Sequence, residues 1–272
     1  MTQKVGFVGL GEMGKPMAKR IVSNGYGLTV FDVMAGPVEE LVAAGAKAAG
    51  TPREVAQASE VTITMVRDTP QSEAVIFGSD GVMEGAKQGS AIVIMSSVLP
   101  SFCQKVAQEA SQKGVEVLDA AVSGARMGAE AGTLAIMAGG SKDVVEKYRA
   151  LLETMGKITH CGDVGSGQVV KLANNIALYI SLFASQEAVS FGTKNGVNED
   201  VILEVLKQGT GNNWAIQNWQ FANPTGRVGP VHWGIPEKDI SMAMQVAREV
   251  NHPVPLTERV SQIVGELIKQ SS

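Results

Sequence analysis

Three polar side chains near the start of a long apolar segment have the types and the spacing for acid–base chemistry. Lys171 is followed by Asn174 and Asn175, three and four residues later, so a helix would place all three on one side of its surface. An ammonium group beside two carboxamides can hold and polarise a carbonyl or a hydroxyl. Partial burial would lower the pKa of the lysine, which suits it to proton transfer. The alternative from these residues alone is a solvated lysine at a helix start.

A second candidate follows the predicted strand 115–118. Its residues run Asp119-Ala120-Ala121-Val122-Ser123-Gly124-Ala125, and a Ser–Gly pair at a strand end can present a hydroxyl and backbone amides to an anion. An ordinary turn is the alternative for this segment. The pair Lys238-Asp239, at the start of a late predicted helix, is a third candidate. Neighbouring acidic and basic residues are also common on exposed helices.

Residues 5–32 carry the pattern of a dinucleotide-binding site. An apolar strand, 5–8, precedes the turn Gly9-Leu10-Gly11-Glu12-Met13-Gly14, a helix is predicted over 16–24, and a second strand ends at Asp32. The glycines let the turn tighten, the backbone approach a pyrophosphate, and the helix pack closely on the strand. The free N–H groups of the helix can then bind the phosphates. A glycine-rich turn used only for packing is the alternative.

The acid that ends this pattern indicates which nucleotide is bound. A carboxylate at Asp32 can accept hydrogen bonds from the ribose hydroxyls of NAD, and it would repel the 2′-phosphate of NADP. We therefore expect the six residues of the turn and Asp32 to bind NAD, with NADP the less favoured cofactor.

The elements around these candidates predict an α/β fold. Strands at 61–66, 91–95, 115–118, 133–138 and 158–160 alternate with helices at 70–76, 100–113 and 141–155. This alternation is typical of a Rossmann-type, doubly wound parallel sheet. Such sheets bind ligands at the carboxyl ends of their strands. We therefore expect Met65, Val66 and Ser96 to lie beside the cofactor.

After residue 163 the sequence has no strand pattern. A helix over 168–194 would be about 40 Å long, and further helices are predicted at 198–208, 214–220, 237–250 and 255–269. We therefore expect an N-terminal Rossmann domain at 1–163 and an all-α domain at 164–272, joined by the long interdomain helix. That helix is apolar on nearly every face, which favours cover by other helices or by another subunit of a homodimer or homotetramer. The segment 221–236, which contains Trp233, is either a loop over the site or a plain connector.

Composition and charge argue against several classes of function. The 23 basic and 27 acidic residues provide no electrostatic attraction for nucleic acid or for an anionic membrane. No apolar run approaches the roughly 18 residues of a membrane span, and the first strand begins too early for a signal peptide, so we expect a cytoplasmic protein. The two cysteines, Cys103 and Cys161, are too few for a disulfide framework. The three histidines show no metal-ligand spacing, so no metal site is expected.

The order and spacing of the motifs resemble those of the β-hydroxyacid dehydrogenase family, which includes 3-hydroxyisobutyrate dehydrogenase, tartronate semialdehyde reductase and 6-phosphogluconate dehydrogenase. Four segments carry the resemblance: Gly6 to Ala18, Asp119 to Gly124, Gly165 to Asn175, and Lys238-Asp239. Ala121 stands where the family usually has proline.

This resemblance implies an NAD-dependent oxidoreductase acting on a small β-hydroxyacid or its semialdehyde. Lys171 would be the general acid when a carbonyl is reduced and the general base when the alcohol is oxidised. Lys238 would reach the cofactor. The substrate would be bound by five residues of the motifs: Ser123, Gly124, Ala125, Asn174 and Asn175. The alternatives are an NADPH-preferring semialdehyde or imine reductase on the same fold and a non-catalytic dinucleotide-binding protein.

Overall fold

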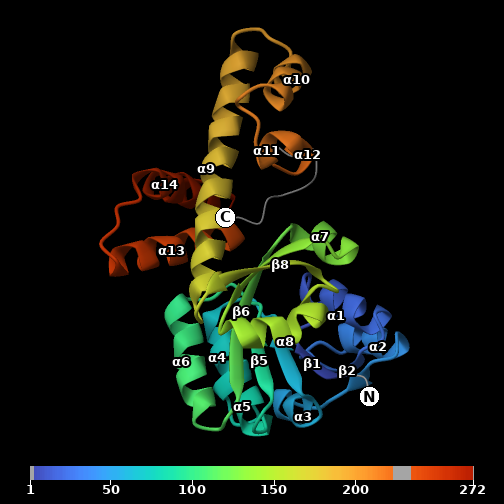
Figure 1. Cartoon of the computed structure of the whole chain (residues 1–272). Coiled ribbons are helices and arrows are strands. Elements are labelled where there is room, and N and C mark those ends of the chain that lie inside the picture. Colours follow the sequence, from blue (N-terminus) through green and yellow to red (C-terminus); the bar gives the residue numbers. More distant parts are fainter. Residues whose placement is uncertain (1–2, 223–233, 272) are drawn as a thin grey trace. The chain divides into compact units, whose positions relative to one another are not determined.

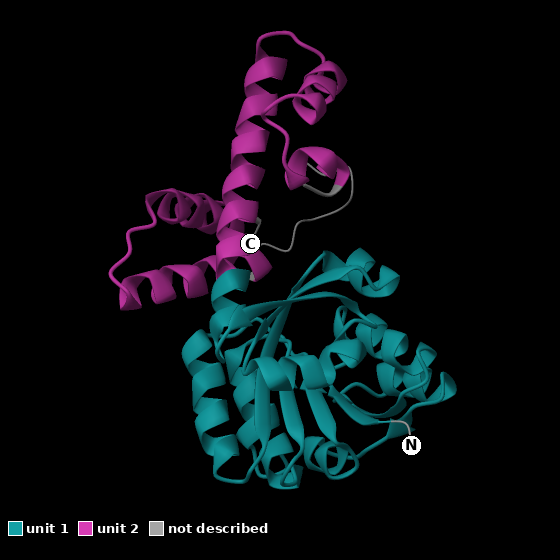
Figure 2. Ribbon diagram, in the orientation of Figure 1, with its two compact units in different colours: residues 1–171 teal, residues 172–272 magenta. Residues whose placement is uncertain are grey.

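The computed structural model describes residues 3–222 and 234–271. The chain forms two compact units, Met1–Lys171 and Leu172–Ser272, coloured separately in Figure 2. The first unit contains the sheet, and the second consists of helices (Figure 1). Most of the predicted loop at 221–236, including Trp233, lies outside the described residues.

The first unit is built on one sheet of eight strands in the order β3-β2-β1-β4-β5-β6-β7-β8. The strands are β1 Lys4–Val8, β2 Gly27–Phe31, β3 Lys47–Ala48, β4 Val61–Thr64, β5 Ala91–Ile94, β6 Glu116–Ser123, β7 Leu134–Gly139 and β8 Gly156–Gly162. This order confirms the predicted Rossmann-type fold. One pair, β6 with β7, is antiparallel, which the sequence analysis did not predict. Only a short helix, α7 (Ala125–Ala131), joins these two strands, and so short a connection favours an antiparallel return.

Helices cover both faces of this sheet, so its central strands are apolar on both sides. In β5, for example, Ala91 and Val93 belong to one core, and Ile92 and Ile94 belong to the other. The first core contains residues of α1 (Gly14–Ser23), α2 (Ala35–Ala43) and α8 (Lys142–Leu152). The second contains residues of α3 (Pro52–Gln57), α4 (Thr69–Phe77), α5 (Val82–Gly85) and α6 (Pro100–Ser111).

The order of the strands determines where a nucleotide can bind. From β1 the chain proceeds to β2 and β3 on one side, and β4 and β5 continue the sheet on the other. The direction of the strand order therefore reverses between β1 and β4, whose residues Val8 and Thr64 are paired at the carboxyl ends. Crevices at such a reversal are the usual ligand sites of open α/β sheets.

Within its described residues, the second unit contains helices and no strand, as predicted. Helix α9 (Ser166–Lys194) begins in the first unit and continues into the second. The other helices are α10 Glu199–Gln208, α11 Trp214–Gln217, α12 Trp219–Ala222, α13 Gly234–Glu249 and α14 Pro255–Ser271. Tyr179 of α9 packs with residues of α13 and α14, and Val189 packs with residues of α10, α11 and α12. Among the described residues, no helix combines the length and the apolar character that crossing a bilayer requires.

Candidate active site

The glycines of the turn after β1 have two different roles. Gly9 has a φ of 96°, and a Cβ there would overlap the backbone carbonyl of Met65 at the end of β4. A Cβ on Gly14 would overlap the carbonyl of Gly9. Both positions therefore require glycine for the turn itself. Gly11 has no atom within 4 Å of an added Cβ, so the space over this residue is open to a pyrophosphate.

Helix α1 begins without a side-chain cap. Its N-cap, Met13, makes no such hydrogen bond, and its first turn contains no acid. Helices α2 and α6 also begin without such a cap, whereas Thr51 and Asp68 cap the N-termini of α3 and α4. The first N–H groups of a helix need partners, and phosphate oxygens are suitable ones. The open space over Gly11 and the uncapped helix start together fit a dinucleotide pyrophosphate.

Asp32, at the end of β2, is hydrogen-bonded to the glycine turn. Its Oδ2 accepts from the backbone N–H of Leu10 at 2.6 Å, and its Oδ1 accepts from that of Met34 at 2.8 Å. Carboxylate oxygens have further lone pairs, so ribose hydroxyls can still donate to this group. The neighbouring side chains of Val33 and Met34 are 87% and 65% exposed, and they offer an apolar surface to a flat ring such as adenine.

The loops after β4 and β5 are joined by a hydrogen bond. The backbone N–H of Val66 donates to the hydroxyl of Ser96 at 2.8 Å. Ser96 is fully buried, so its side chain fixes the loop and does not present a free hydroxyl to solvent. Met65 and Val66 lie against Gly9, since a Cβ on that glycine would contact both. The predicted residues of β1, β4 and β5 therefore meet at one edge of the sheet.

The segment after β6 has an unusual backbone. Gly124 has a φ of 134° and Ala125 a φ of 53°. Positive φ is uncommon outside glycine. Such conformations cost on the order of 1–3 kcal/mol and occur most often at functional sites. Because Ala125 directly follows Ser123 and Gly124, this strain supports the predicted role of the segment in binding substrate.

Lys171 is half-buried on α9 and is the last residue of the first unit. Asn174 and Asn175 follow on the same continuous helix and belong to the second unit. Asn174 is exposed, whereas Asn175 is only 2% exposed. Helical spacing therefore puts the lysine one turn before the two amides, as predicted.

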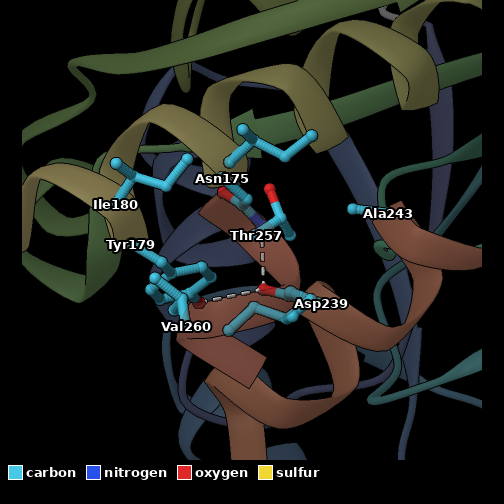
Figure 3. A pocket seen from close by; sticks show the side chains of 9 residues that line it. Asn175, Tyr179, Ile180, Asp239, Ala243, Thr257 and Val260 are labelled. Atoms are coloured by element: carbon cyan, nitrogen blue, oxygen red, sulfur yellow. Dashed lines mark hydrogen bonds between the residues drawn. The ribbon is translucent and has the colours of Figure 1, made fainter. Parts of the chain in front are cut away.

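Within the second unit, Asn175 belongs to a buried polar cluster around Asp239 (Figure 3). Its Nδ2 donates to Asp239 Oδ2 at 2.9 Å, and the Tyr179 hydroxyl donates to the same oxygen at 3.3 Å. The Oδ1 of Asn175 accepts from Asn174 Nδ2 at 3.2 Å. Lys238 Nζ lies 3.3 Å from Asp239 Oδ1. The amide of Asn175 is therefore oriented at both ends.

Tyr179 is a member of this cluster that the sequence analysis missed. Burial, together with the charge of Asp239 and the hydrogen bond to it, raises the pKa of Tyr179, so the phenol remains a donor at neutral pH. Its position four residues after Asn175 was a usable signal, because such residues share a helix face.

Two family models match the two parts of the chain. The family model for the NAD-binding domain of 6-phosphogluconate dehydrogenase matches residues 4–165. The model for the NAD-binding part of NADP-dependent 3-hydroxyisobutyrate dehydrogenase matches residues 165–272.

Individual relatives extend over nearly the whole chain. The 2-(hydroxymethyl)glutarate dehydrogenase of Eubacterium barkeri is 38% identical over 96% of this chain and 87% of its own length. The 3-hydroxyisobutyrate dehydrogenase of Pseudomonas aeruginosa is 36% identical over 93% of this chain and 88% of its own length. The solved structure of Mycobacterium tuberculosis 3-hydroxyisobutyrate dehydrogenase with L-serine has a TM-score of 0.88 and 29% identity, covering 98% of this chain and 94% of that one. The chain therefore belongs to the β-hydroxyacid dehydrogenase family of nicotinamide-dependent oxidoreductases.

Proposed function

We propose that this protein transfers a hydride between NAD and a small β-hydroxyacid or its semialdehyde, with Lys171 as the proton-transferring group. The position of Lys171 carries the proposal. Lys171 is half-buried near the start of α9, in the unit that holds the glycine turn and the Ser123-Gly124-Ala125 segment, in which Ala125 has a positive φ. We further propose residues 1–163 as the nucleotide-binding domain and 164–272 as the domain for substrate and oligomer contacts. The meeting of the two family matches at residue 165 supports this division.

Each side chain has a definite task in this proposal. The bound nicotinamide supplies the hydride in reduction and accepts it in oxidation. Lys171 Nζ donates a proton to the carbonyl oxygen during reduction and takes the proton from the hydroxyl during oxidation. Ser123, Gly124 and Ala125 hold the substrate carboxylate. In the second unit, we assign Asn174 and Asn175 to the substrate hydroxyl and Lys238 to the cofactor.

The names of the relatives support the substrate class. 2-(Hydroxymethyl)glutarate, 3-hydroxyisobutyrate and L-serine, which appear in the names of the three relatives described above, share a hydroxymethyl group on the carbon that bears a carboxylate. A site that binds this carboxylate and places a proton acceptor at the hydroxyl would accept the shared part of all three molecules.

An absorbance assay of nicotinamide reduction tests the proposed activity. The protein is mixed with NAD and each of these three β-hydroxyacids, with lactate as a matched control that has its hydroxyl on the carbon next to the carboxylate. We expect turnover with at least one β-hydroxyacid and little with lactate. Turnover limited to the reduction of a cyclic imine, or no turnover with any β-hydroxyacid or semialdehyde, would contradict the proposal.

We expect NAD to be preferred over NADP because of Asp32. The carboxylate suits the ribose hydroxyls and repels a 2′-phosphate. The ratio of kcat/KM values should favour NAD by roughly tenfold or more, which corresponds to about 1.4 kcal/mol. Replacing Asp32 with asparagine keeps an acceptor for the Leu10 amide and should reduce this ratio. If NADP equals or exceeds NAD as a cofactor for the unaltered protein, the argument from Asp32 is wrong.

We also expect a homodimer or homotetramer. Phe191 of α9 is 72% exposed, and Val201 and Val205 of α10 are 51% and 64% exposed. Exposed apolar side chains on these two helices favour association. Light scattering at micromolar concentration should give two or four times the mass of one chain, and Phe191→Lys should weaken that assembly. A monomeric mass would rule out this prediction.

A further inference from the structure

Helix α9 receives its N-terminal cap from another part of the first unit. Gly165, with a φ of 99°, precedes the helix and has no side chain to cap it. Asp119 of β6 takes over this function, because its Oδ1 accepts from the Gly165 N–H at 2.6 Å and its Oδ2 from the Gln168 N–H at 2.8 Å. A carboxylate at this end of a helix also interacts favourably with the helix dipole.

Two glycines leave room for this carboxylate. Gly139, at the end of β7, is paired with Asp119 in the sheet, and a Cβ there would overlap Asp119 Oδ1. A Cβ on Gly167, in the first turn of α9, would overlap the carbonyl of Met137 and crowd Asp119 Oδ2. The backbone of β7 and that of α9 therefore close around the Asp119 side chain, which explains the glycine at position 167.

The side chain of Gln168 forms hydrogen bonds between the first turn of α9 and the loop after β5. Gln168 is only 1% exposed. Its Nε2 donates to the carbonyl of Ser96 at 2.9 Å, and its Oε1 accepts from the N–H of Val98 at 3.1 Å. Because the Ser96 hydroxyl in turn accepts from the N–H of Val66, the first turn of α9 is hydrogen-bonded to the segments that follow β4 and β5 as well as to β6.

Lys171 lies three residues after Gln168, so the two residues share a side of α9. The bonds that fix the first turn thus also fix the direction in which the lysine leaves the helix. We propose that Asp119 and Gln168 are positioning residues that hold Lys171 at the carboxyl ends of β4 and β5, beside the middle of β6. This inference rests on the proposed role of Lys171 in proton transfer, and it adds two residues that touch neither substrate nor cofactor.

Asp119 is buried, and its charge affects the pKa of the two cysteine thiols. Burial raises the pKa of this carboxyl, and the N–H groups of Gly165 and Gln168 oppose that rise. The nearest thiols are those of Cys103 and Cys161, whose pKa values are raised by burial and then by the charge of Asp119. This negative charge favours the protonated form of both thiols.

The test compares Asp119→Asn and Gln168→Glu with the unaltered enzyme. Asparagine at position 119 would turn its own N–H group toward one of the two backbone N–H groups that Asp119 accepts from. Glutamate at position 168 would lack the N–H group that donates to the carbonyl of Ser96. We expect kcat to fall by roughly 10- to 100-fold in each, as for a catalytic group displaced by about an ångström, while the KM for NAD stays nearly constant. Glu116→Gln removes a carboxylate from the same strand, paired there with Lys147, and should leave kcat unchanged.

Hydrogen exchange of the peptide that spans residues 163–171 provides a readout that is independent of catalysis. Exchange should be faster in Asp119→Asn and unchanged in Glu116→Gln. Unchanged exchange, or faster exchange with the kcat of the unaltered enzyme, would overturn the inference. If Asp119→Asn does not fold, a Gln168→Glu enzyme with unaltered kcat would overturn it as well. A different result would contradict the proposed function itself, namely a Lys171→Ala enzyme that remains active.

Discussion

Lys171→Ala is expected to lower turnover by roughly 10²- to 10⁴-fold, the usual contribution of a positioned acid or base. The alanine variant keeps the glycine turn and the Asp119 cap of α9, since neither involves the lysine side chain. The affinity for NAD, measured by fluorescence titration, should therefore change little. Turnover of the same variant is then measured by the absorbance of the reduced nicotinamide.

The matched control for this variant is Lys194→Ala, which removes an exposed lysine from the last turn of the same helix. It should retain the turnover and the NAD affinity of the unaltered enzyme. A Lys171→Ala enzyme with turnover close to that of the control would remove the lysine from the proposed mechanism.

The second large effect is expected in the glycine turn, where Gly11→Ala and Gly14→Ala should fail in different ways. Gly11 has free space around it, so its alanine variant should fold normally. The new methyl group would occupy the space that the pyrophosphate approaches, and NAD should bind roughly 10- to 100-fold more weakly. Gly14→Ala would overlap the Gly9 carbonyl, so it should lower the melting temperature, at a cost of about 1–3 kcal/mol or more.

Gly265→Ala in α14 is the control, because nothing lies within 4 Å of an added Cβ there either. It should bind NAD normally and should melt at an equal or slightly higher temperature, since alanine favours helices. Thermal melting and NAD titration of the three variants complete the comparison. If Gly11→Ala binds NAD as tightly as the control does, the pyrophosphate does not lie against this turn.

Much of the fold could be predicted because local patterns determine it. The apolar strands, the glycines that end helices and the change to a helical pattern after residue 163 all depend on neighbouring residues. The antiparallel direction of β7 and the short strand β3 could not be predicted in this way. The direction of β7 depends on which strand it pairs with, and β3 has only two residues, Lys47 and Ala48.

The residues of the candidate site also fall into two groups, those that local sequence reveals and those that depend on distant partners. The glycine turn and Asp32 could be recognised because their spacing within about thirty residues has a physical meaning. The roles of Asp119 and Gln168 could not, because their partners lie 46 to 72 residues away along the chain. The strain at Ala125 was also hidden, since a φ of 53° at an alanine is imposed by the fold and not by the residue type.

The turnover of Lys171→Arg tests the central claim most directly. A guanidinium keeps the positive charge but does not release its proton near neutral pH. If Lys171 transfers the proton, the arginine variant should lose nearly as much turnover as Lys171→Ala while still binding NAD. If Lys171 only attracts the substrate carboxylate, arginine should preserve turnover. An arginine variant within roughly tenfold of the unaltered enzyme, which is less than a positioned acid or base contributes, would contradict proton transfer by Lys171.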